Sequence, residues 1–233
     1  MTRIKICGLR DPEHARVAID AGADLLGIVF AESPRQATLP QARALRSAAG
    51  LRIELFEADT AAFDTAIDGA GRPLLIGVFA HQSADEINRI AAAADLDAVQ
   101  LSGGEHPALV ARLTRPVIRV HHVDADSTIE QLLARVADRP PTIAALETKS
   151  AQGGGGGRTF DWSVAAAVAR RHPIMLGGGL NPDNVADAIE QVAPWAVDVS
   201  SGVEAEPGVK DADKIRAFIA NARGALAGTR GRA

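Results

Sequence analysis

The sequence predicts an α/β protein of the (β/α)8 barrel class. Short β-branched runs alternate with alanine-rich amphipathic stretches, eight times each, along 233 residues. This alternation favours parallel strands joined by right-handed crossovers, and eight such units in a chain of this length are typical of a closed barrel. An open, doubly wound sheet would have the same order of elements and is the alternative.

Each predicted strand is a short β-branched run followed by a turn, and each predicted helix is an amphipathic stretch. Two helix starts carry a capping residue before proline, Asp11 before Pro12 and Asn181 before Pro182. In chain order the strands are expected at 3–7, 24–30, 73–79, 97–101, 116–120, 142–146, 173–177 and 196–200. The helices are expected at 11–22, 39–49, 84–94, 105–114, 126–138, 161–171, 182–193 and 211–226.

One barrel domain is expected over residues 1–233, with an extra segment at about 51–72. This segment exceeds the usual connection of about 2–6 residues between a helix and the next strand. We therefore expect an added strand or helix there, on the N-terminal face of the barrel and away from the chemistry. The pentaglycine run at 153–157 follows a strand end and precedes a helix, so we interpret it as a mobile loop rather than a linker.

The composition excludes several classes of protein. A formal net charge of -4 without a long basic run argues against nucleic acid or an anionic membrane surface as the main partner. The single cysteine excludes an internal disulfide and fits a reducing cytosol. The N-terminus lacks the apolar core of a signal peptide, and no apolar run approaches the ~18 residues of a membrane span. A soluble cytoplasmic protein is expected.

The active site of such a barrel lies at the C-terminal ends of the strands. Glycine- and serine-rich segments follow the seventh and eighth strands, and they contain Gly178, Gly179, Ser200, Ser201 and Gly202. Ordinary glycine turns and a serine cap would explain either segment alone. Together they predict a cradle for a phosphorylated small molecule, because glycine lets backbone N–H groups approach an anion and serine hydroxyls donate to it.

Three other strand ends or loops carry side chains suited to chemistry. Cys7 is either a small buried side chain or, with a lowered pKa, a base that faces the mouth of the barrel. Glu147 is either a solvated rim residue or a protonated general acid in an apolar pocket. Arg35 is either part of a rim salt bridge or a bidentate ligand for a carboxylate.

The histidines do not predict a metal site. His81, His121 and His122 have no carboxylate or cysteine partner at ligand spacing. Because neighbouring residues of a strand point to opposite faces, Arg119 and His121 share one side and are either a solvated pair or a substrate-lining pair.

A resemblance to a known family runs through nearly the whole chain in the right order. The motifs KICG, SPR, TFDW and SSGVE-x-x-PG-x-K together resemble phosphoribosylanthranilate isomerase of tryptophan biosynthesis. The resembling segments are KICGLR (5–10), GADLLGIVFAESPR (22–35), AVQLSGGE (98–105), GGGGGRTFDW (153–162), GGLNPDNV (178–185) and DVSSGVEAEPGVKD (198–211).

This resemblance implies a reaction and a fold. The fold is a (β/α)8 barrel, and the reaction is the Amadori rearrangement of N-(5-phosphoribosyl)anthranilate to 1-(2-carboxyphenylamino)-1-deoxyribulose 5-phosphate. It implies neither a cofactor nor a metal, and it leaves monomer and homodimer open.

The resemblance also implies roles for particular residues. Cys7 matches the general base, and Arg35 matches the arginine that grips the anthranilate carboxylate. Glu147 falls where the family has an aspartate general acid, and Ser102 falls where it usually has a histidine. The phosphate ligands match Gly178, Gly179, Ser200, Ser201 and Gly202.

Two other functions fit parts of the sequence. An isomerase of the histidine-pathway type would perform the same rearrangement, but it predicts an aspartate at the end of the first strand and a phosphate cradle in each half. A non-catalytic phosphate-binding relative would need neither Cys7 nor Arg35.

Overall fold

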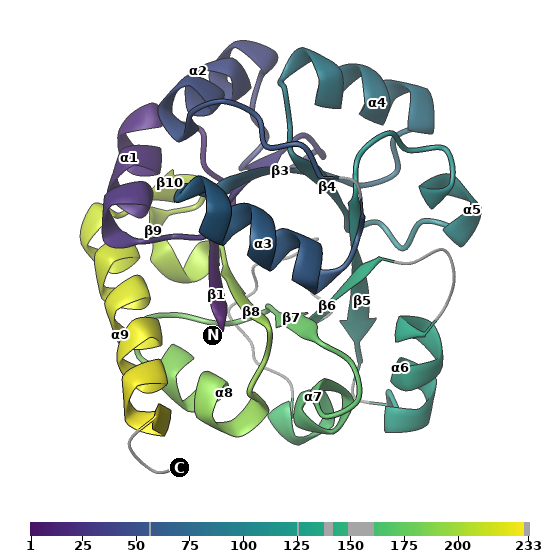
Figure 1. The fold of residues 1–233 in the computed structure, drawn as a ribbon, viewed down its shortest axis with the longest axis vertical. Helices are drawn as coiled ribbons and strands as arrows, with labels where there is room; N and C mark the ends of the chain where they lie inside the picture. The colour runs from purple at the N-terminus through teal and green to yellow at the C-terminus, as the bar shows by residue number, and fades with distance from the viewer. Residues whose placement is uncertain (56, 125, 138–141, 149–160, 231–233) are drawn as a thin grey trace.

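The fold is a closed barrel of parallel strands surrounded by helices (Figure 1). This computed structural model describes residues 1–55, 57–124, 126–137, 142–148 and 161–230, with the backbone alone for 226–230. Strands β1 to β8 follow one another around the barrel in chain order, and β8 pairs with β1 to close it. The predicted barrel class is confirmed, and the open sheet is excluded.

Every predicted strand and helix has a counterpart in the structure. The barrel strands are β1 (Arg3–Ile6), β2 (Leu25–Val29), β3 (Leu74–Phe79), β4 (Ala98–Leu101), β5 (Val117–Val123), β6 (Ile143–Thr148), β7 (Ile174–Leu176) and β8 (Ala196–Val199). The helices that follow them are α1 (Pro12–Ala21), α2 (Leu39–Ala49), α4 (Ala84–Ala93), α5 (Pro107–Val110), α6 (Ile129–Val136), α7 (Trp162–Ala169), α8 (Val185–Val192) and α9 (Ala212–Arg230).

Some boundaries differ from the prediction for local reasons. Helix α8 begins three residues later than expected, because the Asn181 side chain accepts hydrogen bonds from the backbone N–H groups of Asp183 and Asn184 and so closes a turn instead. Residues 201–210, which lie between the last predicted strand and the last predicted helix, form a short 3-10 turn and a small hairpin of β9 (Glu204–Glu206) and β10 (Val209–Lys210). The pentaglycine run lies outside the described residues.

Helix α3 (Thr60–Ala70) comes from the segment 51–72 and lies across one end of the barrel (Figure 1). Its Phe63 and Ile67 pack against residues that line the barrel interior near the strand starts, such as Leu25 and Leu74. This end is the N-terminal face, opposite the ends of the strands where chemistry is expected.

An ion cluster fixes α3 to the first strand. The buried Arg3 guanidinium donates to Asp64 at 2.6 Å and to both carboxylate oxygens of Asp68 at 2.9 Å. The Trp195 indole N–H also donates to Asp64, at 3.1 Å, while its ring packs edge-on against Phe63. Helix α3 therefore closes the barrel with both apolar and charged contacts.

Among the described residues, no helix has the length and apolarity needed to cross a lipid bilayer.

Loss of the Phe63 ring should destabilise the chain without altering catalysis. Phe63 is fully buried, so Phe63→Ala is expected to lower the free energy of unfolding by about 3–5 kcal/mol. The exposed Thr65→Ala on the same helix is the control and should change it by less than about 0.5 kcal/mol. Urea unfolding measures both values. A Phe63→Ala variant as stable as Thr65→Ala would show that α3 does not close the core.

Candidate active site

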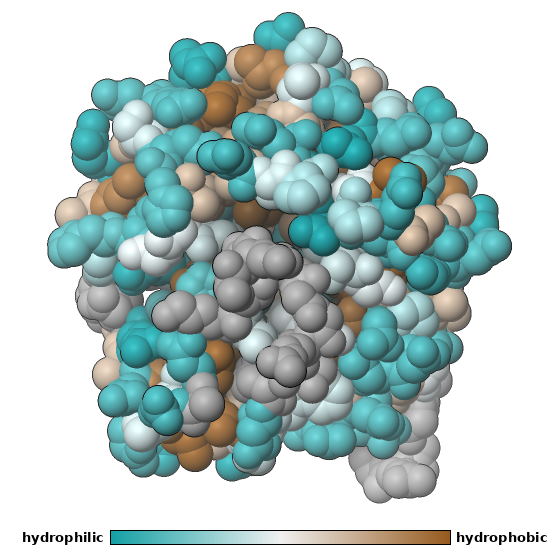
Figure 2. All heavy atoms as spheres, turned by 180° about the vertical axis from the view of Figure 1, so that it is seen from behind, coloured by the Kyte–Doolittle hydropathy of each residue, from teal (hydrophilic) through white to brown (hydrophobic). Residues whose placement is uncertain are grey.

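The strand ends opposite α3 bring together the side chains that we call the mouth: Cys7, Gln100, His122, Glu147 and Asp198. Four of them lie two residues beyond a residue that lines the barrel interior, namely Ala98, Val120, Ala145 and Ala196. Cys7 lies two residues beyond the buried Lys5, whose ammonium pairs with Asp198. Since side chains alternate along a strand, all of them face inward. The surrounding surface on this side is mostly hydrophilic (Figure 2).

A buried ion pair lies at the base of the mouth. The Lys5 ammonium, which is fully buried, donates to Asp198 Oδ2 at 2.9 Å across the paired strands β1 and β8. Burial alone lowers the pKa of Lys5, but the Asp198 carboxylate and the Cys7 sulfur beside it raise the pKa more, so Lys5 stays charged. The pair acts electrostatically on both candidate catalytic groups.

Glu147 has the properties of a general acid. Burial raises its pKa, the Asp198 carboxylate raises it further and Lys5 lowers it, with a result of about 7. The carboxyl is therefore substantially protonated near neutral pH, as a general acid must be.

Gly177 on the neighbouring strand end provides the space for this longer side chain. A Cβ atom at position 177 would lie 3.0 Å from Glu147 Cγ and 3.3 Å from Oε1. The absence of that atom lets the Glu147 side chain lie flat against the end of β7.

Cys7 differs from the expectation in its protonation. Burial raises the pKa of its thiol, and the nearby Lys5 lowers it by less, so the pKa lies above the ordinary value. The expected lowering by polar surroundings is wrong, because the thiol is only 6% exposed and Asp198 adds a negative charge. Gly27 makes room for the thiol, since a Cβ there would lie 2.7 Å from Cys7 Sγ.

The glycine- and serine-rich loops after β7 and β8 lie against each other. Gly178 and Gly179 have φ angles of 84° and 73°, in the left-handed region that favours glycine. A Cβ at Gly202 would overlap the Leu180 carbonyl, so the two loops meet backbone to backbone. Ser200 donates to the Cys7 carbonyl at 3.2 Å, which joins this loop pair to the end of β1.

Arg35 lies at the edge of the mouth in an ion pair, as one of its two interpretations predicts, with Glu204 as a partner that the sequence did not indicate. Its guanidinium donates from Nε and Nη2 to the two oxygens of Glu204, at 2.7 and 2.9 Å. Glu204 also accepts from Lys210 Nζ at 2.9 Å, and Lys210 in turn donates to the Ser200 carbonyl. Glu204 and Lys210 of the β9–β10 hairpin thereby connect Arg35 to the loop after β8. Gly8 lies inside this cluster, and a Cβ atom at that position would be 2.9 Å from Arg35 Cδ.

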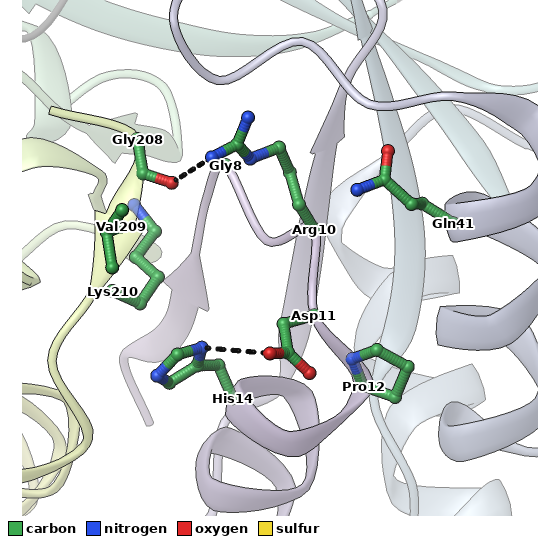
Figure 3. Close-up of a pocket in the computed structure, with 9 residues that line it drawn as sticks. All are labelled: Gly8, Arg10, Asp11, Pro12, His14, Gln41, Gly208, Val209 and Lys210. Carbon is green, nitrogen blue, oxygen red and sulfur yellow. Dashed lines mark hydrogen bonds and ion pairs between the residues drawn. The ribbon is translucent and has the colours of Figure 1, made fainter.

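A groove of about 420 Å³ flanks this cluster on the outside of the barrel (Figure 3). It lies between the start of α1 and the hairpin, where Arg10 donates to the Gly208 carbonyl at 2.8 Å. Gly8 and Lys210 line the groove and also belong to the cluster around Arg35, so the groove approaches the candidate site from its side.

Comparison with known proteins identifies the family. A family model described as N-(5′phosphoribosyl)anthranilate (PRA) isomerase matches residues 57–221. An N-(5′-phosphoribosyl)anthranilate isomerase of Roseiflexus castenholzii is 44% identical over 224 residues, which cover 95% of this chain and 98% of that protein. The chain belongs to the N-(5′-phosphoribosyl)anthranilate isomerase family.

Further relatives and solved structures agree with this family assignment. The N-(5′-phosphoribosyl)anthranilate isomerase of Dehalococcoides mccartyi is 39% identical, with 94% of each chain covered. The crystal structure of phosphoribosyl anthranilate isomerase from Thermotoga maritima superposes with a TM-score of 0.80 at 35% identity and covers 96% of this chain and 100% of that one. A Thermus thermophilus isomerase gives a TM-score of 0.78 at 30% identity, with 96% and 99% covered. The resemblance read from the motifs is confirmed.

The structure also corrects which residues of β5 face the site. Arg119 and His121, interpreted as either a solvated or a substrate-lining pair, lie on the outer side of the strand with Val117 and Val123, which pack toward the helices. His122 is the histidine that faces inward. Among the described residues, no three His, Cys, Asp or Glu side chains are grouped as metal ligands.

The raised pKa of Glu147 makes stability depend on pH. Between 4.5 and about 7 the folded chain holds a proton that the unfolded chain has lost, so stability falls as the pH rises through this range. We expect Glu147→Gln to match the wild type near pH 4.5 and to be the more stable protein at about pH 8, since the amide carries no charge to bury. Urea unfolding at both pH values measures this. The exposed Glu206→Gln should show no such dependence, and a difference that stays constant with pH would contradict the raised pKa.

Gly177 and Glu147 should be energetically coupled. Gly177→Ala places a methyl group against Glu147 and should lower kcat by up to about 10²-fold, the scale of a ~1 Å misplacement. Glu147→Asp should also lower activity, because its carboxyl no longer reaches as far. In a protein that already carries Glu147→Asp, however, Gly177→Ala should lower kcat much less than it does in the wild type, because the shorter aspartate side chain avoids the methyl group. Simply additive losses in this double-mutant cycle would refute the contact.

Proposed function

We propose that the chain catalyses the Amadori rearrangement of N-(5-phosphoribosyl)anthranilate to 1-(2-carboxyphenylamino)-1-deoxyribulose 5-phosphate, a step of tryptophan biosynthesis. The observation that carries this proposal is the mouth itself, where a carboxyl with a pKa of about 7 and a buried thiol both lie beside the Lys5–Asp198 pair. Membership of the family supports the same reaction. The cytoplasm is the proposed compartment, as the composition suggests.

The first chemical step requires an acid. Glu147, protonated near neutral pH, donates its proton to the furanose ring oxygen, and the ring opens to an iminium ion. The carboxylate that remains is stabilised by Lys5, which lies close enough to lower the pKa of Glu147.

The second step requires a base. Cys7, as the thiolate, takes the proton from C2′ of the open sugar, and the resulting enol-amine tautomerises to the ketone. Burial raises the pKa of this thiol, so the step needs positive charges that favour the thiolate. The Lys5 ammonium already does so, and the positive iminium ion adds a second cation beside the thiol.

The two ends of the substrate are assigned to separate groups. Gly178, Gly179, Ser200, Ser201 and Gly202 hold the phosphate between the loops after β7 and β8. Arg35 holds the anthranilate carboxylate with the guanidinium donors that are not engaged by Glu204. Holding both ends places the reacting carbon between acid and base.

The proposal is tested by following the loss of phosphoribosylanthranilate fluorescence as full-length protein is added. Cys7→Ser should keep its fold and its affinity for reduced 1-(o-carboxyphenylamino)-1-deoxyribulose 5-phosphate, the compound in complex with a phosphoribosyl anthranilate isomerase that is 34% identical to this chain. It should lose more than about 90% of kcat, since a serine hydroxyl is a far weaker base. Wild-type protein without activity would reject the reaction, and a serine variant above a tenth of wild-type kcat would reject Cys7 as the base.

A further inference from the structure

Three buried acceptor atoms in the mouth have no hydrogen-bond partner among the described residues. They are Gln100 Oε1, His122 Nδ1 and Asp198 Oδ1. Buried polar atoms in folded proteins almost always have a partner. Amide and carboxylate oxygens accept hydrogen bonds only, so a ligand that completes this site must bring donors.

His122 faces the mouth next to the candidate acid. Its strand β5 pairs with β6 in a register that places His122 opposite Glu147. The residues two positions earlier, Val120 and Ala145, line the barrel interior, so both side chains point inward from neighbouring strands about 4.8 Å apart. A molecule that contacts the Glu147 carboxyl therefore comes within reach of the imidazole.

The hydrogen bond to Ser102 fixes the tautomer of this imidazole. His122 Nε2 lies 3.1 Å from the Ser102 carbonyl oxygen, which can only accept, so Nε2 carries the hydrogen. In the neutral ring Nδ1 is then an acceptor. The same Ser102 is bonded through its hydroxyl to Gln100 Nε2 at 3.3 Å. Ser102 thus orients two side chains, and each leaves one unpartnered acceptor in the mouth.

We infer that His122 is a substrate-binding residue whose Nδ1 accepts a hydrogen bond from a hydroxyl of the sugar. The inference rests on the proposed function, which places the sugar ring against Glu147. Of the parts of that substrate, the phosphate and the carboxylate are acceptors near neutral pH and cannot satisfy Nδ1. The ribosyl hydroxyls on C2′ and C3′ are donors on the same five-membered ring as the oxygen that Glu147 protonates, and the two of them can serve His122 and Gln100. The anilino N–H is also a donor, but it faces its own ortho carboxylate.

A pair of substitutions separates the two ring nitrogens. His122→Gln keeps a donor in the place of Nε2, for the Ser102 carbonyl, but has no acceptor at the Nδ1 position. His122→Asn keeps an acceptor at the Nδ1 position and loses the distal donor. His121→Gln, the same change on the outer side of the same strand, is the matched control.

The measurements are KM and kcat for N-(5-phosphoribosyl)anthranilate, and the dissociation constant of the reduced product analogue. Each constant is calculated with the concentration of folded protein, which circular dichroism determines. His122→Gln should raise KM and the dissociation constant about tenfold, the effect of one lost hydrogen bond, and leave affinity for inorganic phosphate unchanged. His122→Asn should stay within about threefold of the wild type, and His121→Gln should not change either constant.

Other results would overturn the inference. If KM and the dissociation constant rise equally in the His122→Gln and His122→Asn variants, the imidazole ring matters but its Nδ1 atom does not. If neither constant changes in the His122→Gln variant, Nδ1 does not bind the substrate. A tenfold effect of His121→Gln would place the cause in the strand rather than in the mouth. In all these cases the wild type still converts the substrate, so the proposed function stands. Wild-type protein that neither converts the substrate nor binds the analogue would reject the proposed function, and this inference with it.

Discussion

The ion pair of Lys5 and Asp198 sets the electrostatics of the whole mouth. A lysine that is fully buried at the centre of a barrel must keep an anion beside it, and the pairing of β1 with β8 supplies Asp198 at 2.9 Å. The two charges have opposite effects on their neighbours. Asp198 favours the protonated form of Glu147, while Lys5 stabilises the anionic forms that the proposed reaction requires of Glu147 and Cys7. In that proposal the pair favours both proton transfers without taking part in either.

Much of the architecture was predictable because it depends on local patterns. Alternating β-branched and amphipathic segments predict a barrel, and the active site of a barrel lies at the C-terminal ends of its strands. The placement of Cys7, Glu147 and the glycine- and serine-rich loops after β7 and β8 at that end follows from these two rules. Lys5 was also within reach of such reasoning, because it lies two residues before Cys7 and must share its face.

The remaining features depend on register and on contacts between distant segments. A strand with apolar residues on both faces, such as β5, does not reveal from its sequence which face points into the barrel. For this reason the sequence pointed to Arg119 and His121, rather than His122, as candidates to line the site. The pair of Arg35 and Glu204 joins residues 169 positions apart, through a hairpin that the loop-like sequence did not suggest. The start of α8 was misplaced because Asn181 caps a turn as readily as a helix.

Helix α3 bears on a different property of the molecule. A barrel exposes apolar interior residues at its N-terminal end unless something covers them, and here Phe63 and Ile67 of the same chain do so. A cover supplied by a second chain would contribute less as the protein is diluted, since it would dissociate. Because α3 is covalently part of the barrel it closes, this share of the folding free energy is independent of protein concentration.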